Sequence, residues 1–127
     1  MSLDIRCEQL DGYFLVQAQG EFTLDGGKRA VEQGIRTAIR SGSTRILYDI
    51  RNVRGLDLDQ ASVTSRFTIG VHASQMLPQG VWMAVLVSKE QFDDYKFVET
   101  VVRNRGRRMK TTPDEDAAIA WLVRPPS

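Results

Sequence analysis

Three carboxylates follow the most apolar central stretch of the chain and are the first candidates for chemistry. Asp49 lies in the run Arg45–Ile50, and Asp57 and Asp59 lie in the segment that follows it. Ligands of open α/β sheets favour the carboxyl ends of strands, and hard cations take carboxylate oxygens. One hypothesis is therefore a divalent-metal or acid–base site. We favour a structural hypothesis without a metal, in which Asp57 and Asp59 cap a helix. Asp49 then pairs with Arg51 or a backbone donor.

The sequence does not assemble the nucleophile and base of a covalent catalyst. His72 is the only histidine, and a general base needs a nucleophile and an orienting partner beside it. There is no Gly-x-Ser-x-Gly elbow. Cys7 is the only cysteine and lies in an expected strand, where cysteine acts as a small buried hydrophobe. We therefore assign no catalytic residue and no cofactor, and we expect a protein that is not an enzyme.

One dense basic run lies near the C-terminus and could contact an anion or a nucleic acid. A structural explanation competes, because cations favour a helix C-terminus and protect an edge strand from pairing. The net charge is only +1 and no aromatic residues interleave with the run, so we expect no nucleic-acid partner. The candidate anion-binding residues are Arg103, Arg105, Arg107 and Arg108, with Lys110 beside them.

A group of large apolar residues surrounds the exit of the second expected helix. Phe67, Met76 and Trp82, with Leu77 and Met83, could line a pocket for an apolar ligand or lipid. Lipid-transfer domains of the CRAL–TRIO type have a loosely similar α/β arrangement. Ordinary core packing explains the same residues, and we prefer it.

Hydrophobic periodicity predicts alternating strands and helices. Alternating residues predict strands at 3–8 and Tyr13–Gln19, and Asp11-Gly12 suits a tight turn with both residues at positive φ. The other expected strands are Arg45–Ile50, Val81–Val87 and Arg108–Thr111. The first expected helix is Lys28–Ser41, capped by Thr23 or Asp25, and the second is Asp59–Gln75. The third begins with a capping box at Ser88–Gln91 and runs to about Arg105. The fourth is capped by Thr112 and ends before Pro125. The order ββαβαβαβα predicts an α/β fold with a mixed, mostly parallel five-stranded sheet. We expect Tyr48 and Trp82 to be neighbours inside it.

Length and composition bound the class of protein. The chain has 127 residues, the size of one domain, and we expect a single domain over 1–127. Hydrophobic residues make up 42% and charged residues 26%, close to globular averages. A single cysteine rules out an intramolecular disulfide, and the N-terminus lacks the apolar core of a signal peptide. No apolar run approaches the roughly 20 residues of a membrane helix, so we expect a cytoplasmic protein without membrane insertion.

Two segments resemble the SpoIIAA-like proteins, relatives of the STAS domains of anti-sigma factor antagonists. Ile46–Val53 looks like the family's apolar strand that ends in Asp and a short loop. Asp114–Leu122 looks like the acidic-Ala-x-x-Trp-Leu ending of the SpoIIAA-like branch. The resemblance covers nearly the whole chain and implies the SpoIIAA-like fold.

The resemblance also implies a regulatory role with an altered control site. In the antagonists, the loop after the central strand carries Asp-Ser-Ser-Gly, and its first serine is phosphorylated. The matching positions here run from Asp57 to Gln60, and the phosphoacceptor position is Leu58, which has no hydroxyl. We therefore expect a domain that binds a protein partner or self-associates, for example as a homodimer, without that phosphorylation. The expected partner surface comprises Arg54, Asp57, Leu58, Asp59 and Ser62.

Overall fold

The computed structural model describes residues 3–55 and 60–124, and the side chains of all of these except residues 60–65. In these residues the chain forms a mixed sheet of five strands with four helices, as the sequence predicts. The elements in chain order are β1 (Asp4–Gln9), β2 (Phe14–Glu21), α1 (Leu24–Arg40), β3 (Arg45–Arg54), α2 (Gln60–Met76), β4 (Trp82–Leu86), α3 (Phe92–Asn104), β5 (Arg108–Thr112) and α4 (Glu115–Val123).

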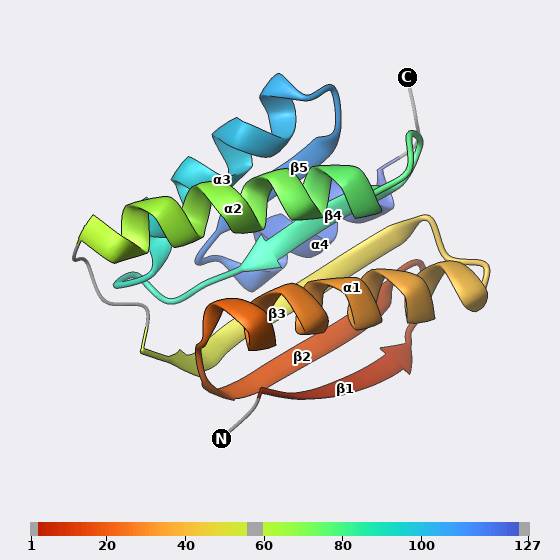
Figure 1. Ribbon diagram of the computed structural model, residues 1–127. Helices are drawn as coiled ribbons and strands as arrows, with labels where there is room; N and C mark the ends of the chain where they lie inside the picture. The colour runs from red at the N-terminus through yellow and green to blue at the C-terminus, as the bar shows by residue number, and fades with distance from the viewer. Residues whose placement is uncertain (1–2, 56–59, 125–127) are drawn as a thin grey trace.

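The spatial order of the strands follows their order in the chain, from β1 at one edge to β5 at the other (Figure 1). β1 and β2 pair antiparallel, whereas β2, β3, β4 and β5 run parallel to one another. The hairpin, the crossover from β2 to β3 and the edge position of β5 are therefore as predicted. The apolar run Val81–Val87 is buried throughout and supplies the inner strand β4.

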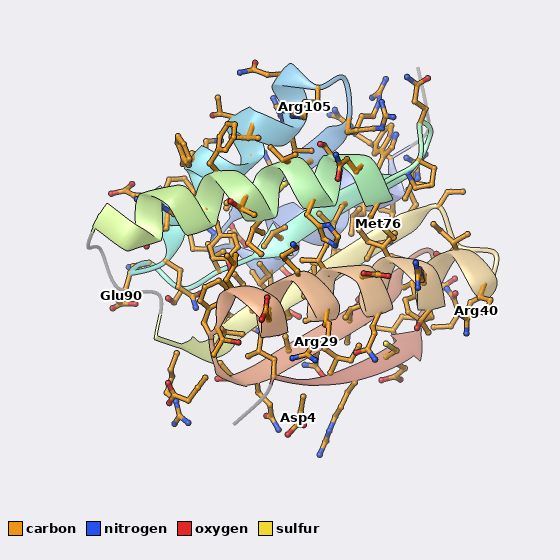
Figure 2. All side chains as sticks on the ribbon, viewed as in Figure 1. Asp4, Arg29, Arg40, Met76, Glu90 and Arg105 are labelled. Atoms are coloured by element: carbon orange, nitrogen blue, oxygen red, sulfur yellow. The ribbon has the colours of Figure 1, made fainter. Side chains whose placement is uncertain are left out.

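The helices form a layer on each face of the sheet, and each layer has its own core. Figure 1 shows α1 and α2 in front of the sheet and α4 behind it. The larger core joins α1, α2 and α3 to one face through residues such as Ile35, Tyr48 and Leu77. The smaller core joins α4 to the other face through Trp82 and Leu122, with Leu47, Ala84, Leu86 and Ala118. Figure 2 labels five charged residues whose side chains are exposed on the surface: Asp4, Arg29, Arg40, Glu90 and Arg105.

Two helical glycines allow the front layer to pack closely. A Cβ built on Gly34 of α1 would lie 2.9 Å from Cε2 of Tyr48. A Cβ on Gly70 of α2 would lie 2.8 Å from Cβ of Val101 in α3. The absence of a side chain at these positions lets α1 approach the sheet and α2 approach α3, which offsets the poor helix propensity of glycine.

The central strand is longer than predicted. β3 continues through Arg54, whereas the sequence pattern ended the strand at Ile50. The register with β2 passes from Gln17↔Asp49 to Gln19↔Asn52, so β3 carries an extra residue, a β-bulge. The bulge lets Ile50 and Val53, an odd number of residues apart, both reach the larger core. Their spacing breaks the period of two, which is why it resembled a loop.

Two predicted helix and turn details also differ. Asp114, not Thr112, is the N-cap of α4, because its side chain accepts a hydrogen bond from Ala117 N. Thr112 belongs to β5, and its hydroxyl accepts from Asp114 N at 3.1 Å. In the β1–β2 turn Gly12 has φ of +88°, but Asp11 keeps a negative φ, so the expected pair of positive φ angles is wrong.

The two aromatic residues predicted as neighbours lie on opposite faces. Tyr48 belongs to the larger core and Trp82 to the smaller one. Both are buried, so each was rightly placed inside the protein. Strand β4 is apolar on both faces, and therefore its sequence carries no alternation that could assign Trp82 to one side.

Candidate partner-binding edge of the sheet

Asp49 holds the bulged end of β3. Its carboxylate is buried and accepts hydrogen bonds from Arg51, through the backbone N at 3.1 Å, Nε at 3.0 Å and one Nη at 2.9 Å. Burial disfavours the charged carboxylate, but these bonds, with a smaller contribution from Gln17, outweigh it and lower the pKa of Asp49. The expectation that Asp49 pairs with Arg51 and a backbone donor is confirmed.

Gln91 fastens the end of β3 to the start of α3. Its amide nitrogen donates to Ile50 O at 2.9 Å and to Val53 O at 3.0 Å. Its amide oxygen accepts from Ser88 N at 2.8 Å, while Gln91 N donates to the Ser88 hydroxyl at 3.3 Å. The reciprocal Ser88–Gln91 bonds confirm the predicted capping box, but it forms a turn just before α3. Sequence analysis missed the bonds to β3, since no local pattern reveals an acceptor 38 or 41 residues away.

Residues at the carboxyl ends of β2 and β3 are joined by two further contacts. Phe22 N donates to Arg54 O at 2.7 Å, and Arg54 Nε lies 3.1 Å from a Glu21 carboxylate oxygen. The Glu21 and Arg54 side chains are 51% and 74% exposed, so this ion pair is a surface feature of small energetic weight. In the helix layer, Arg66 of α2 forms an ion pair with the buried Asp94 of α3. The carboxyl edge thus has an anchored backbone and exposed charges.

The expected partner surface is only partly within the described residues. Arg54 is exposed at the end of β3. Asp57, Leu58 and Asp59 lie outside the described residues, and Ser62 lies in α2 at a position whose side chain is not described. The predicted grouping of Asp57 and Asp59 with Asp49 therefore lies outside the described residues. Within the described side chains, no three His, Cys, Asp or Glu residues are grouped as metal ligands.

The four arginines of the basic run do not lie in one patch. Arg103 Nε donates to Met109 O at 2.9 Å and lies 3.5 Å from Glu99, tying α3 to β5. Arg105 is the exposed C-cap of α3. Arg107 Nε donates to Leu77 O at 2.7 Å, and Arg108 lies over the ring of Trp82. The predicted anion-binding set is thus divided, because Arg107 and Arg108 line one pocket and Arg103 and Arg105 do not.

The prediction that Phe67, Met76 and Trp82 line one apolar pocket is wrong. Phe67 is 50% exposed, Met76 packs against the larger core, and Trp82 belongs to the core on the other face of the sheet. A cavity of about 40 Å³ does lie beneath α1 and α2, lined by other residues that include Ala30, Tyr48 and Ile69. It is far smaller than the roughly 150 Å³ cavity that admits benzene. No lipid of ordinary length would fit such a space.

His72 and Cys7 lie in unrelated places. His72 Nε2 is 3.7 Å from a Glu32 carboxylate oxygen, between α2 and α1. Cys7 lies on β1 and is exposed, so the prediction of a buried thiol is wrong. Leu3 and Ile5 are half-buried as the alternation predicts, but Cys7, the register partner of the buried Val16, is uncovered because β1 is an edge strand.

The chain has a SpoIIAA-like α/β fold. An anti-sigma factor antagonist from Mycobacterium paratuberculosis is similar over 97% of this chain and 96% of its own, with a TM-score of 0.67 and 16% identity. An uncharacterised protein with a SpoIIAA-like fold from Shewanella loihica is similar over 95% and 94%, with a TM-score of 0.53 and 17% identity. No protein-family model and no curated protein matches the chain. At these identities the likeness confirms the predicted fold.

None of the helices in the described part of the chain combines the length and apolarity that a bilayer crossing demands.

Proposed function

We propose that this protein is a non-enzymatic regulatory domain that binds a protein partner, or a second copy of itself, through the carboxyl edge of its sheet. The observation that carries the proposal is the likeness, over nearly the full length of both chains, to an anti-sigma factor antagonist. The proposed surface comprises Arg54, Asp57, Leu58, Asp59 and Ser62. The cytoplasm is the proposed compartment, because the chain has a single cysteine and a reducing setting suits a free thiol.

The structure around this surface supports a role in binding. The backbone N–H and the side chain of Arg51 donate hydrogen bonds to the carboxylate of Asp49, which leaves this carboxylate poorly suited to act as a base. The bonds from Gln91 fix the end of β3 before the proposed surface begins. A rigid support lowers the conformational entropy that the end of β3 would lose on binding a partner.

The proposal differs from the family mechanism in its control. Leu58 stands at the phosphoacceptor position implied by the resemblance, and leucine cannot accept a phosphoryl group. Binding in this protein is therefore independent of phosphorylation at residue 58. An apolar side chain there would instead contribute contact area to the partner.

The test compares three full-length variants for partner capture and self-association. Tagged wild type, Leu58→Asp and the control Arg40→Glu, an exposed residue of α1, are used to capture proteins from the source cells. Captured proteins are quantified by mass spectrometry, and oligomeric state is measured by light scattering on a sizing column. We expect Leu58→Asp to lose at least tenfold of one captured protein, or to dissociate a dimer, while Arg40→Glu retains it. Equal capture and equal mass for all three proteins would refute the surface.

A further inference from the structure

A row of cationic and aromatic side chains crosses the sheet near the amino ends of the parallel strands. Arg45 of β3, Trp82 of β4 and Arg108 of β5 are register partners, so their side chains share the face covered by α4. The guanidinium carbon of Arg45 lies 3.6 Å from the centre of the Trp82 ring, and that of Arg108 lies 4.9 Å from it. Trp82 is 4% exposed, and Trp121 of α4 lies 5.1 Å away, centre to centre. The Trp82 ring at the centre of the row is therefore fixed by packing.

A pocket of about 530 Å³ opens beside this row. Arg107 joins Arg45 and Arg108 in its wall, and the bond from Arg107 Nε to Leu77 O orients that third guanidinium. The rest of the wall is supplied by the Thr44 segment and by the turns at Pro78–Gly80 and Gly106. Hydroxyl, amide and backbone N–H groups of these segments are further possible donors.

The charges of this pocket are not balanced by the described residues. No Asp or Glu is among the described residues that line it, and the three arginines form no ion pair within the described part of the chain. The Nη1 atom of Arg45 is buried and has no hydrogen-bond partner there. Burial first, and then the charge of Arg108, lower the pKa of Arg45. A buried cationic donor without an acceptor is costly, and an anion in the pocket beside the guanidinium would stabilise its charge.

We infer that this pocket is a binding site for a small anion that carries a phosphate group. Phosphate offers several oxygens to the planar forks of Arg45 and Arg108, which suit bidentate bonding. Arg107 donates through Nε to Leu77 O and through Nη1 to Arg105 O, so its Nη2 is left for a single contact with the anion. The phosphate charge of about −1.5 to −2 at neutral pH would offset the repulsion between Arg45 and Arg108. The guanidiniums cover the ring of Trp82, so a nucleic-acid base has no exposed aromatic surface on which to stack. The pocket lies at the start of β3, where Arg45 is, whereas Arg54 lies at the end of that strand, and the inference does not depend on the proposed partner surface.

The test measures binding of inorganic phosphate and glycerol phosphate to the full chain by calorimetry and by tryptophan fluorescence. Sodium chloride at matched ionic strength controls for general screening. We expect saturable binding of at least one phosphate compound. A preference for inorganic phosphate would indicate the free ion as the ligand, and a preference for glycerol phosphate would indicate a phosphomonoester.

The variants assign the binding to the row. Arg45→Gln and Arg108→Gln should each weaken binding at least tenfold, whereas Arg40→Gln, on the exposed surface of α1, should leave it unchanged. Arg45→Lys keeps the cation beside Trp82 but removes the fork, so it should remain folded and bind with intermediate affinity. The proposal would be overturned by no saturable binding, by equal binding in all variants, or by the same response to chloride. Binding of a phosphorylated peptide but of neither small phosphate would also overturn it.

Discussion

Asp49 shows how a carboxylate at the end of a buried strand can serve structure instead of chemistry. Sequence analysis grouped it with Asp57 and Asp59 as a possible acid–base or metal site. In the structure the carboxylate oxygens of Asp49 accept hydrogen bonds from Arg51 at the bulge, and these bonds account for the lowered pKa of Asp49. The charge of Asp49 is therefore expected to stabilise the fold.

Replacement of Asp49 tests this role through its pH dependence. Because the folded-state pKa lies below the ordinary value of about 4, the stabilisation is present above that pH and is lost as the pH falls through the folded-state pKa. Asp49→Asn should lower the free energy of unfolding by about 1–3 kcal/mol at pH 7. Urea unfolding at pH 7 and pH 3 should show that the difference narrows in acid.

The control for this measurement is Glu8→Gln, since Glu8 is exposed on the edge strand β1. It should change the free energy of unfolding by no more than about 0.5 kcal/mol at pH 7. A constant difference between wild type and Asp49→Asn across the acid range would contradict the assignment of the stabilisation to the ionised carboxylate.

At the scale of elements, Gln91 decides how α3 meets the central strand. The residue is 7% exposed, and its side chain bonds to the backbone of β3 and of the turn that opens α3. A sequence pattern can predict the turn, because Ser88 and Gln91 are three residues apart. It cannot predict that the same amide also serves the bulged end of β3.

Gln91→Leu should therefore destabilise the protein and loosen the edge beside Arg54. The variant leaves the Ile50 and Val53 carbonyls and the Ser88 N–H without their partner, at a cost of about 2–4 kcal/mol. Hydrogen exchange should rise in the segments at 50–55 and 88–95 more than in α1. Glu90→Leu, at the neighbouring exposed position, is the matched control. Equal exchange in both variants would show that Gln91 does not hold this junction.

At the scale of the whole molecule, the order of elements could be predicted from the sequence, but several orientations could not. Alternation and capping residues marked the helices and strands, because those signals are local. The bulge in β3 depends on pairing with β2, and the face taken by Trp82 depends on α4. Arg45 and Arg108 are 63 residues apart in the numbering and become neighbours of Trp82 only through the parallel register.

The smaller core should contribute measurably to global stability although α4 is short. Leu122 is fully buried in it, whereas the adjacent Val123 is 50% exposed. Leu122→Ala should lower the free energy of unfolding by about 2–5 kcal/mol, because it leaves a cavity against the sheet. Val123→Ala should change it by about 0.5 kcal/mol or less. Denaturant titration followed by tryptophan fluorescence measures both, and similar values would show that α4 is not anchored as described.

The strand order has a consequence for synthesis on the ribosome. In the described sheet each strand lies beside the one made just before it, so growth proceeds from the first hairpin toward the far side. No described strand has to enter between two that are already joined. Each new strand would become the unpaired edge of the growing sheet, and β5, which carries Arg108 and Lys110, would be the last edge strand to form. Positive charges at the last strand to arrive would then discourage a neighbouring nascent chain from continuing the sheet.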